Sequence, residues 1–127
     1  MNPSVPVSWG ELIDKVTILE IKTERLTSDA ALKNVHHELA ALQPFADQAV
    51  SNAGVAALKA ELKRINETLW KIEDDIREKE AAKSFDEEFI RLARAVYFTN
   101  DERGRVKAKL NVALNSDLTE EKHYSAY

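Results

Sequence analysis

The sequence has no cysteine, only three prolines and three glycines, and no long apolar run that is free of charge. The lack of cysteine excludes disulfides, thiolate zinc sites, iron–sulfur clusters and thiol nucleophiles, and it fits a reducing compartment. So few turn-forming residues in 127 positions exclude an all-β fold of this size. Because residues 1–6 show no basic or apolar leader and no segment is apolar enough to span a bilayer, we expect a cytoplasmic protein with no membrane partner.

The residues that are abundant are typical of one helical domain. Alanine, glutamate, leucine and lysine are the most frequent residue types, and all four favour helices. A hydrophobic content of 44% is enough for one ordinary core without disulfides or metals. The formal net charge of −4 argues against nucleic-acid binding by the surface as a whole, because such binding needs many cations. We therefore expect one all-α domain over residues 1–127.

The spacing of apolar residues predicts two helices in the first half of the chain. The first helix begins at Trp9, because Ser8 and the glutamate three residues later form a capping box. The second begins after Ser28 and ends before Pro44, which cannot donate a backbone hydrogen bond. Residues 45–52 show no clear period, and residues 51–54 are predicted to form a loop; a turn or two of helix in this stretch is the alternative.

The second half of the chain predicts a long helical hairpin, over about residues 54–82 and 86–114. In both segments apolar residues alternate at spacings of three and four, as in a coiled coil, and Ser84 is the expected cap of the second. The short turn makes the two helices antiparallel neighbours. Alternatively, Thr99–Glu102 caps a new helix and divides the second segment. The expected fold is an all-α, three- to four-helix antiparallel bundle dominated by this hairpin, with the first two helices packed along it and an irregular tail from about residue 115.

Basic residues gather at the end of the predicted hairpin away from its turn. This cluster is a candidate site for an anionic ligand or RNA. Alternatively, the tail acids Asp117, Glu120 and Glu121 fold back and neutralise it. Near the turn, Arg91 and Arg94 are expected to pair with the acidic residues of the facing helix. The cluster consists of Lys59, Lys63, Arg64, Arg103, Arg105, Lys107 and Lys109.

Two features of the predicted helices imply specific contacts. Arg103 lies on the apolar seam, where an unpaired charge is costly, so a carboxylate or backbone oxygen must lie near it, and Asp14 is one candidate. Trp9 and Trp70 are expected to pack in the core or at its edge. Trp70 alternatively anchors a second subunit.

No metal and no cofactor is expected. His36 and His37 are adjacent on a helix and point about 100° apart, so they cannot easily share one ion. Acids spaced three apart could hold magnesium, but those near a helix start or near arginines have a structural explanation. The acid pairs in question are Glu11 with Asp14, and Asp75 with Glu78.

The chain resembles a small bacterial family of about this length that is a domain of unknown function. The resemblance covers nearly the whole chain and rests on the segments VPVSWGELIDK, ILEIK, EDDIR, VY with ND, KAKLN and EEK with the following tyrosine. It implies no known activity, but it indicates where a site would lie. These segments and Arg103 supply polar and aromatic groups that could line one cleft if the first helix crosses the hairpin and the tail returns: Trp9, Glu11, Asp14, Lys15, Asp74, Arg77, Asn100, Asp101, Arg103, Lys107, Asn111, Lys122 and Tyr124.

Three functions are compatible with these patterns. The leading hypothesis is a non-enzymatic helical interaction or scaffold module that self-associates as a homodimer and binds a protein partner. It predicts exposed apolar surface and no deep polar pocket. The alternative is a small-molecule-binding protein or enzyme acting on a phosphate- or carboxylate-bearing substrate, which predicts a cleft where charges converge. RNA binding at the basic end of the hairpin ranks third, and no catalytic residue is assigned.

Overall fold

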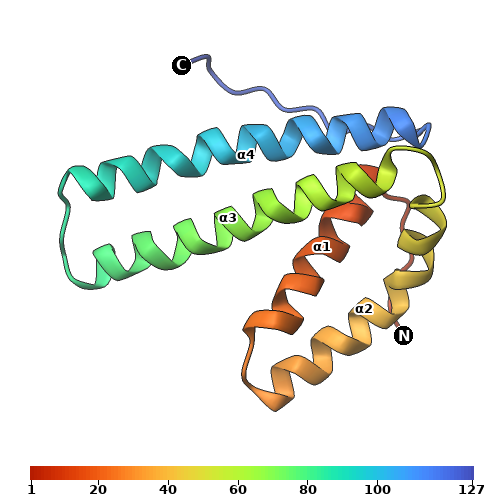
Figure 1. Cartoon of the computed structure of the whole chain (residues 1–127), viewed down its shortest axis with the longest axis horizontal. Coiled ribbons are helices and arrows are strands. Elements are labelled where there is room, and N and C mark those ends of the chain that lie inside the picture. Colours follow the sequence, from red (N-terminus) through yellow and green to blue (C-terminus); the bar gives the residue numbers. More distant parts are fainter.

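The computed structural model describes residues 1–127 and consists of four α-helices without a β-strand (Figure 1). The predicted all-α class is therefore confirmed. The helices α3 and α4 form the expected long antiparallel hairpin. The helix bounds are Trp9–Arg25 for α1, Asp29–Ala49 for α2, Val55–Ala81 for α3 and Glu87–Ala113 for α4.

The start of α1 lies where the sequence predicts it. The Ser8 hydroxyl accepts a hydrogen bond from the backbone N–H of Glu11 at 3.1 Å, which satisfies one of the free donors of the first turn. Ser28 caps α2 in the same way, through the N–H of Ala31 at 3.3 Å. Each capping serine has an extended backbone, so the chain enters its helix directly.

The predicted end of α2 before Pro44 is wrong, because the helix continues through Pro44 to Ala49. A proline inside a helix costs about 3 kcal/mol, since it removes one backbone hydrogen bond and crowds the preceding turn. Here Pro44 lies on the exposed side of the helix, where water can satisfy the freed carbonyl. On the other side Ala46 and Ala49 are almost fully buried in the core. Their packing continues the helix beyond the proline.

The hairpin turn uses Asp86, and not the predicted Ser84, as the cap of α4. The Asp86 carboxylate accepts the backbone N–H of Phe89 at 3.0 Å, and Ser84 donates its hydroxyl to the same carboxylate. The hydrogen bond from the Phe89 backbone and the one from the Lys79 ammonium group lower the pKa of Asp86 to about 2. A charged carboxylate at this position also suits the positive end of the helix dipole, which favours Asp86 over a serine.

The alternative break at Thr99–Glu102 does not occur, and α4 is continuous. The Asn100 side chain is turned to Arg103, whose Nη1 donates to its Oδ1 at 3.5 Å, and it caps no new helix.

The molecule has the shape of an L, because α1 crosses the hairpin at its end away from the turn (Figure 1). The second helix packs mainly against α1. Both helices therefore lie across the hairpin, whereas the prediction placed them along it. The core is at this crossing and includes Ile13, Val16, Leu62 and Leu110, all 0% exposed. None of the helices is long and apolar enough to cross a membrane.

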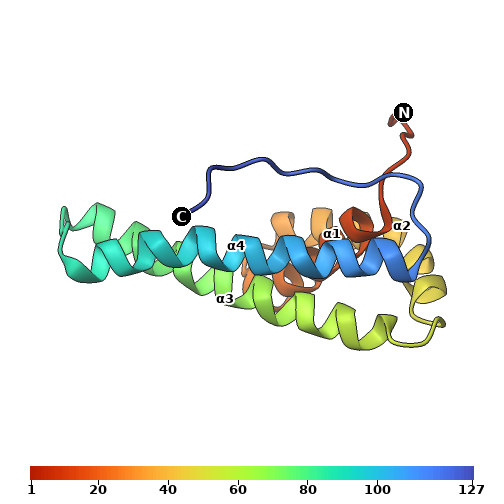
Figure 2. The same cartoon turned by 90° about the horizontal axis from the view of Figure 1, so that it is seen from above.

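Two regions of the molecule lie next to the crossing of α1 and the hairpin. The half nearest the turn, residues 71–98, extends past α1 and α2 with no other helix over it, and it is called the arm below (Figure 1). The concave corner where α1 meets α3 and α4 is called the elbow. The tail from Asn115 turns back and runs beside α4 toward the arm, as both views show (Figure 2).

Candidate functional site

A buried ion pair holds α1 to the hairpin at the crossing. Asp14 is 1% exposed, and both its carboxylate oxygens accept hydrogen bonds from the Arg103 guanidinium, with the Nε to Oδ1 distance at 2.9 Å. The expectation that a carboxylate or backbone oxygen lies near Arg103 is confirmed, and Asp14, one candidate, is its partner. The hydrogen bond to Asp14 raises the pKa of Arg103, which therefore keeps its charge at every ordinary pH.

The remaining hydrogen-bonding capacity of Asp14 is used by α3. Asn66 donates through its Nδ2 to Asp14 Oδ1 and to Thr17 Oγ1, each at 2.9 Å. Thr17 in turn donates to the backbone oxygen of Asp14 at 2.8 Å. Every buried side-chain nitrogen and oxygen in the chain has a partner. The network therefore joins three helices with complete hydrogen bonding, as a structural joint requires.

The hydrogen-bond network continues one helical turn further along α4. Lys107 donates to Glu11 at 2.9 Å and to Glu120 of the tail at 2.8 Å. Burial opposes the charge of this lysine, but these two hydrogen bonds outweigh it and raise the pKa of Lys107. Beside it, the N–H of Gly10 donates to Asn111 Oδ1 at 2.7 Å. The start of α1 is thus fixed to the end of α4.

The Lys107–Glu120 contact makes docking of the tail depend on pH. The hydrogen bond from Lys107 lowers the pKa of Glu120 below its ordinary 4.5. A carboxyl group whose pKa is lower in the folded than in the unfolded protein stabilises the folded contact at pH values above its unfolded-state pKa. This stabilisation is lost as the pH falls through the folded-state pKa. We expect Glu120 to titrate below 4.5 in an NMR titration, and the tail to detach along with it.

The matched control is Lys107→Gln, which removes the cation and should return Glu120 to an ordinary titration. A wild-type Glu120 that titrates at 4.5 or above would contradict the contact.

The tail and α4 enclose a cleft of about 480 Å³, called the tail cleft below. At its end the Tyr127 hydroxyl donates to Asp101, which raises the pKa of Tyr127. The Tyr127 ring also contacts Tyr97 and Phe98, with ring centres 5.2 and 4.7 Å apart. Five residues predicted for the site line this cleft, namely Asp101, Lys107, Asn111, Lys122 and Tyr124, and Arg105 and Glu120 lie there too.

The elbow is a second, separate hollow of about 480 Å³. Its apolar wall is formed by Ile18 and Ile21 of α1 and by Leu69 and Trp70 of α3. Four further predicted site residues line it: Asp74, Arg77, Asn100 and Arg103. Asp14 lies behind Arg103 and is closed to solvent.

The thirteen predicted site residues therefore do not line one cleft. The two hollows share no lining residue, and each takes a part of the set. Lys15 lies apart from both and pairs with Glu38 of α2 at 3.0 Å. Trp9 is half-buried against the core, and Glu11 reaches only the Lys107 end of the network.

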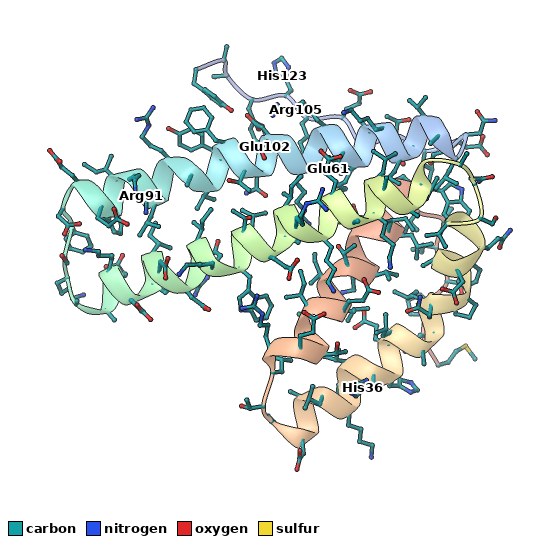
Figure 3. The ribbon with its side chains drawn as sticks, viewed as in Figure 1. His36, Glu61, Arg91, Glu102, Arg105 and His123 are labelled. Atoms are coloured by element: carbon teal, nitrogen blue, oxygen red, sulfur yellow. The ribbon has the colours of Figure 1, made fainter.

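The predicted basic cluster is largely neutralised, but mostly by α1 and only in part by the tail. Lys59 pairs with Glu20 at 3.0 Å and Lys63 with Glu24 at 2.7 Å. The hydrogen bond that Lys63 donates to Glu24 raises the pKa of Lys63. Of the three tail acids only Glu120 pairs with the cluster, through Lys107. Arg64, Arg105 and Lys109 form no ion pair and line a groove of about 600 Å³ between α3 and α4. Glu61 and Glu102 line the same groove, and Figure 3 labels them together with Arg105.

Other predicted charge contacts are replaced by local ones. Arg91 hydrogen-bonds to Glu88 on its own helix, which raises the pKa of Arg91, and not to the facing acidic residues. Arg94 donates to the Tyr97 hydroxyl at 3.4 Å. His36 on α2 lies far from His123 in the tail (Figure 3), and no three acidic or histidine side chains gather where they could hold a metal ion.

Sequence reasoning missed several residues of the joint. Asn66 lies four residues after Leu62 and three before Leu69, so its position on an apolar face was a usable signal of a buried polar contact. Thr17 and Gly10 gave no comparable signal, because their roles depend on how closely α1 approaches α3 and α4.

The fold and the network define an all-helical protein in which ion pairs join α1, and α2 packed on it, to the hairpin of α3 and α4. The family model described as "Family of unknown function (DUF6165)" matches residues 3–127, so the chain belongs to this family. No curated protein and no solved structure matches the chain. The family assignment agrees with the resemblance in the sequence and supplies no activity.

Proposed function

We propose that the protein is a helical interaction module that self-associates through the arm and the elbow and thereby presents its surfaces to protein partners. The observation that carries this proposal is the uncovered arm. Apolar residues on it that would be covered in a closed bundle are open to solvent, with Phe85 57% and Ile90 56% exposed. Exposed apolar surface of this kind marks interaction sites in soluble proteins.

The chemistry of the charged residues supports an interaction role over a catalytic one. The buried ionic groups Asp14 and Lys107, and the half-buried Arg103, are engaged by partners within the chain. They fix the angle between α1 and the hairpin, and such a joint is what a module with two rigid faces requires. A cytoplasmic location remains our expectation from the lack of cysteine.

Sedimentation equilibrium of the purified protein over a range of micromolar concentrations tests this proposal. We expect the mean mass to rise from the chain mass of 14.3 kDa toward twice that value, because a dimer forms by mass action. A mass of one chain at every concentration would overturn self-association.

A second candidate function is the binding of a small anionic molecule in the tail cleft. The observation in its favour is that Arg105 forms no ion pair and that the Lys122 ammonium is 4.0 Å from its nearest carboxylate, Glu120. A hollow of about 480 Å³ with tyrosine rings at its edge is large enough for a phosphate- or carboxylate-bearing metabolite. Such a ligand would stabilise the single chain, whereas self-association needs no ligand.

RNA binding remains the third candidate and has the least support. Four of the seven cations that suggested it are engaged by carboxylates: Lys59, Lys63, Arg103 and Lys107. Charges that are already paired contribute little to phosphate binding.

A further inference from the structure

We propose that a second copy of this chain binds with its hairpin turn in the elbow, and that the contact is reciprocal. Each arm then lies antiparallel to the other arm, α3 against α3, about a two-fold axis. This inference rests on the proposed self-association and specifies which residues make it.

The face of α3 that would form the contact is the one turned to the elbow. Trp70, Asp74 and Arg77 all line the elbow, and their spacings of four and three place them on one stripe of the helix. Ala81 continues this stripe at the next spacing of four, where α3 ends beside the turn. The stripe therefore has a large apolar residue at one end, a small one at the other, and opposite charges between them.

Such a stripe is complementary to itself when reversed. A two-fold axis between positions 75 and 76 sets Asp74 opposite Arg77 of the second copy, and the same pair forms again across the axis. It also sets Trp70 opposite Ala81 of the second copy, so that a large side chain meets a small one. Asp74 has no ion pair within the chain, and Arg77 has only an exposed contact to Glu73 on its own helix. Both charges are therefore available to a partner.

The elbow and the turn also match in polarity. The turn carries Ala81, Ala82 and Phe85, all exposed, and Phe85 is 57% exposed. The wall of the elbow carries Ile18, Leu69 and Trp70, which are half-buried, beside Ile21, which is only 1% exposed. Burying the turn in the elbow would remove apolar surface from water on both copies, which is the main favourable contribution to association.

Charges at the border of the contact agree with the same arrangement. Lys22 and Arg25, at the end of α1, form no ion pair within the chain. Glu78 and Glu80, near the turn, likewise form none. When the turn of one copy enters the elbow of the other, these carboxylates approach the end of α1. Opposite charges at the rim steer association and oppose alternative registers.

Charge reversal tests the contact. Asp74→Arg and Arg77→Asp should each raise the dissociation constant of the dimer at least about tenfold, since each sets like charges opposite each other twice. The double variant exchanges the two signs, so it should recover most of the wild-type affinity. Asp117→Arg, a reversal in the exposed tail, is the matched control and should leave the dissociation constant unchanged. Circular dichroism of each variant checks that the helices are intact.

The absence of cysteine gives a second measurement, which reports which positions lie next to each other in the dimer. Mixing Asp74→Cys protein with Arg77→Cys protein under oxidising conditions should give a cross-linked dimer faster than either protein alone. A dimer that persists with both single reversals and does not cross-link in the mixture would overturn this arrangement but not the proposed function. A wild-type protein that stays monomeric, or that binds only a different partner at the elbow, would overturn the arrangement as well.

Discussion

Arg103→Met should lower the free energy of unfolding by about 3 kcal/mol, because it leaves the Asp14 carboxylate buried without its cation. The lower end of the usual range applies, since the Arg103 side chain is 26% exposed and water can partly replace it. Urea denaturation measures this change. Arg94→Met is the matched control: Arg94 is on the same helix, exposed and without a carboxylate partner, so we expect a change within about 0.5 kcal/mol.

A double variant separates the charge from the packing. Adding Asp14→Asn to Arg103→Met removes the buried charge, so part of the lost stability should return. If the double variant lost as much unfolding free energy as the two single variants together, the role of Asp14 and Arg103 as a pair would be contradicted.

Gly10→Ala should lower the free energy of unfolding by about 1–3 kcal/mol, the usual cost of overfilling a packed contact. A Cβ atom at Gly10 would lie 2.6 Å from the backbone oxygen of Lys107 and 3.0 Å from Asn111 Oδ1. The first is a backbone atom within α4, so it cannot move aside unless α1 moves away. That movement would also weaken the Gly10–Asn111 hydrogen bond.

Gly104→Ala is the matched control for this substitution, because it adds the same methyl group where there is room. A Cβ at Gly104 would come no closer than 3.7 Å to another atom, the Lys122 ammonium nitrogen. In the interior of α4, alanine should instead stabilise the protein by about 0.5–1 kcal/mol. A Gly10→Ala variant as stable as wild type in thermal unfolding would refute the close approach of the two helices.

The sequence was sufficient where local patterns decide the structure. The hairpin followed from the seam of α3, and the start of α1 followed from Ser8. The Asp14–Arg103 pair was accessible because a charge on an apolar seam must find a partner somewhere. In each case the position of one residue relative to its own helix carries the information.

The sequence was insufficient where the outcome depends on distant packing. The continuation of α2 through Pro44 depends on the burial of Ala46 and Ala49, which no local pattern reveals. The angle between α1 and the hairpin depends on the close approach at Gly10 and on Asn66 between three helices. The first helix crosses the hairpin and the tail returns, as the predicted single cleft required, but at this angle the predicted residues are divided between the elbow and the tail cleft.

Hydrogen exchange at low and high protein concentration tests most directly whether the arm and the elbow form the interaction surface. Hydrogen exchange measures the protection of backbone amides in each segment of the chain. It therefore shows where the contact lies as well as whether it forms. We predict that the arm (residues 71–98) and the end of α1 (residues 18–25) gain protection as the concentration rises, while the exposed face of α2 does not change. Equal protection at both concentrations, or a gain confined to α2, would contradict the account.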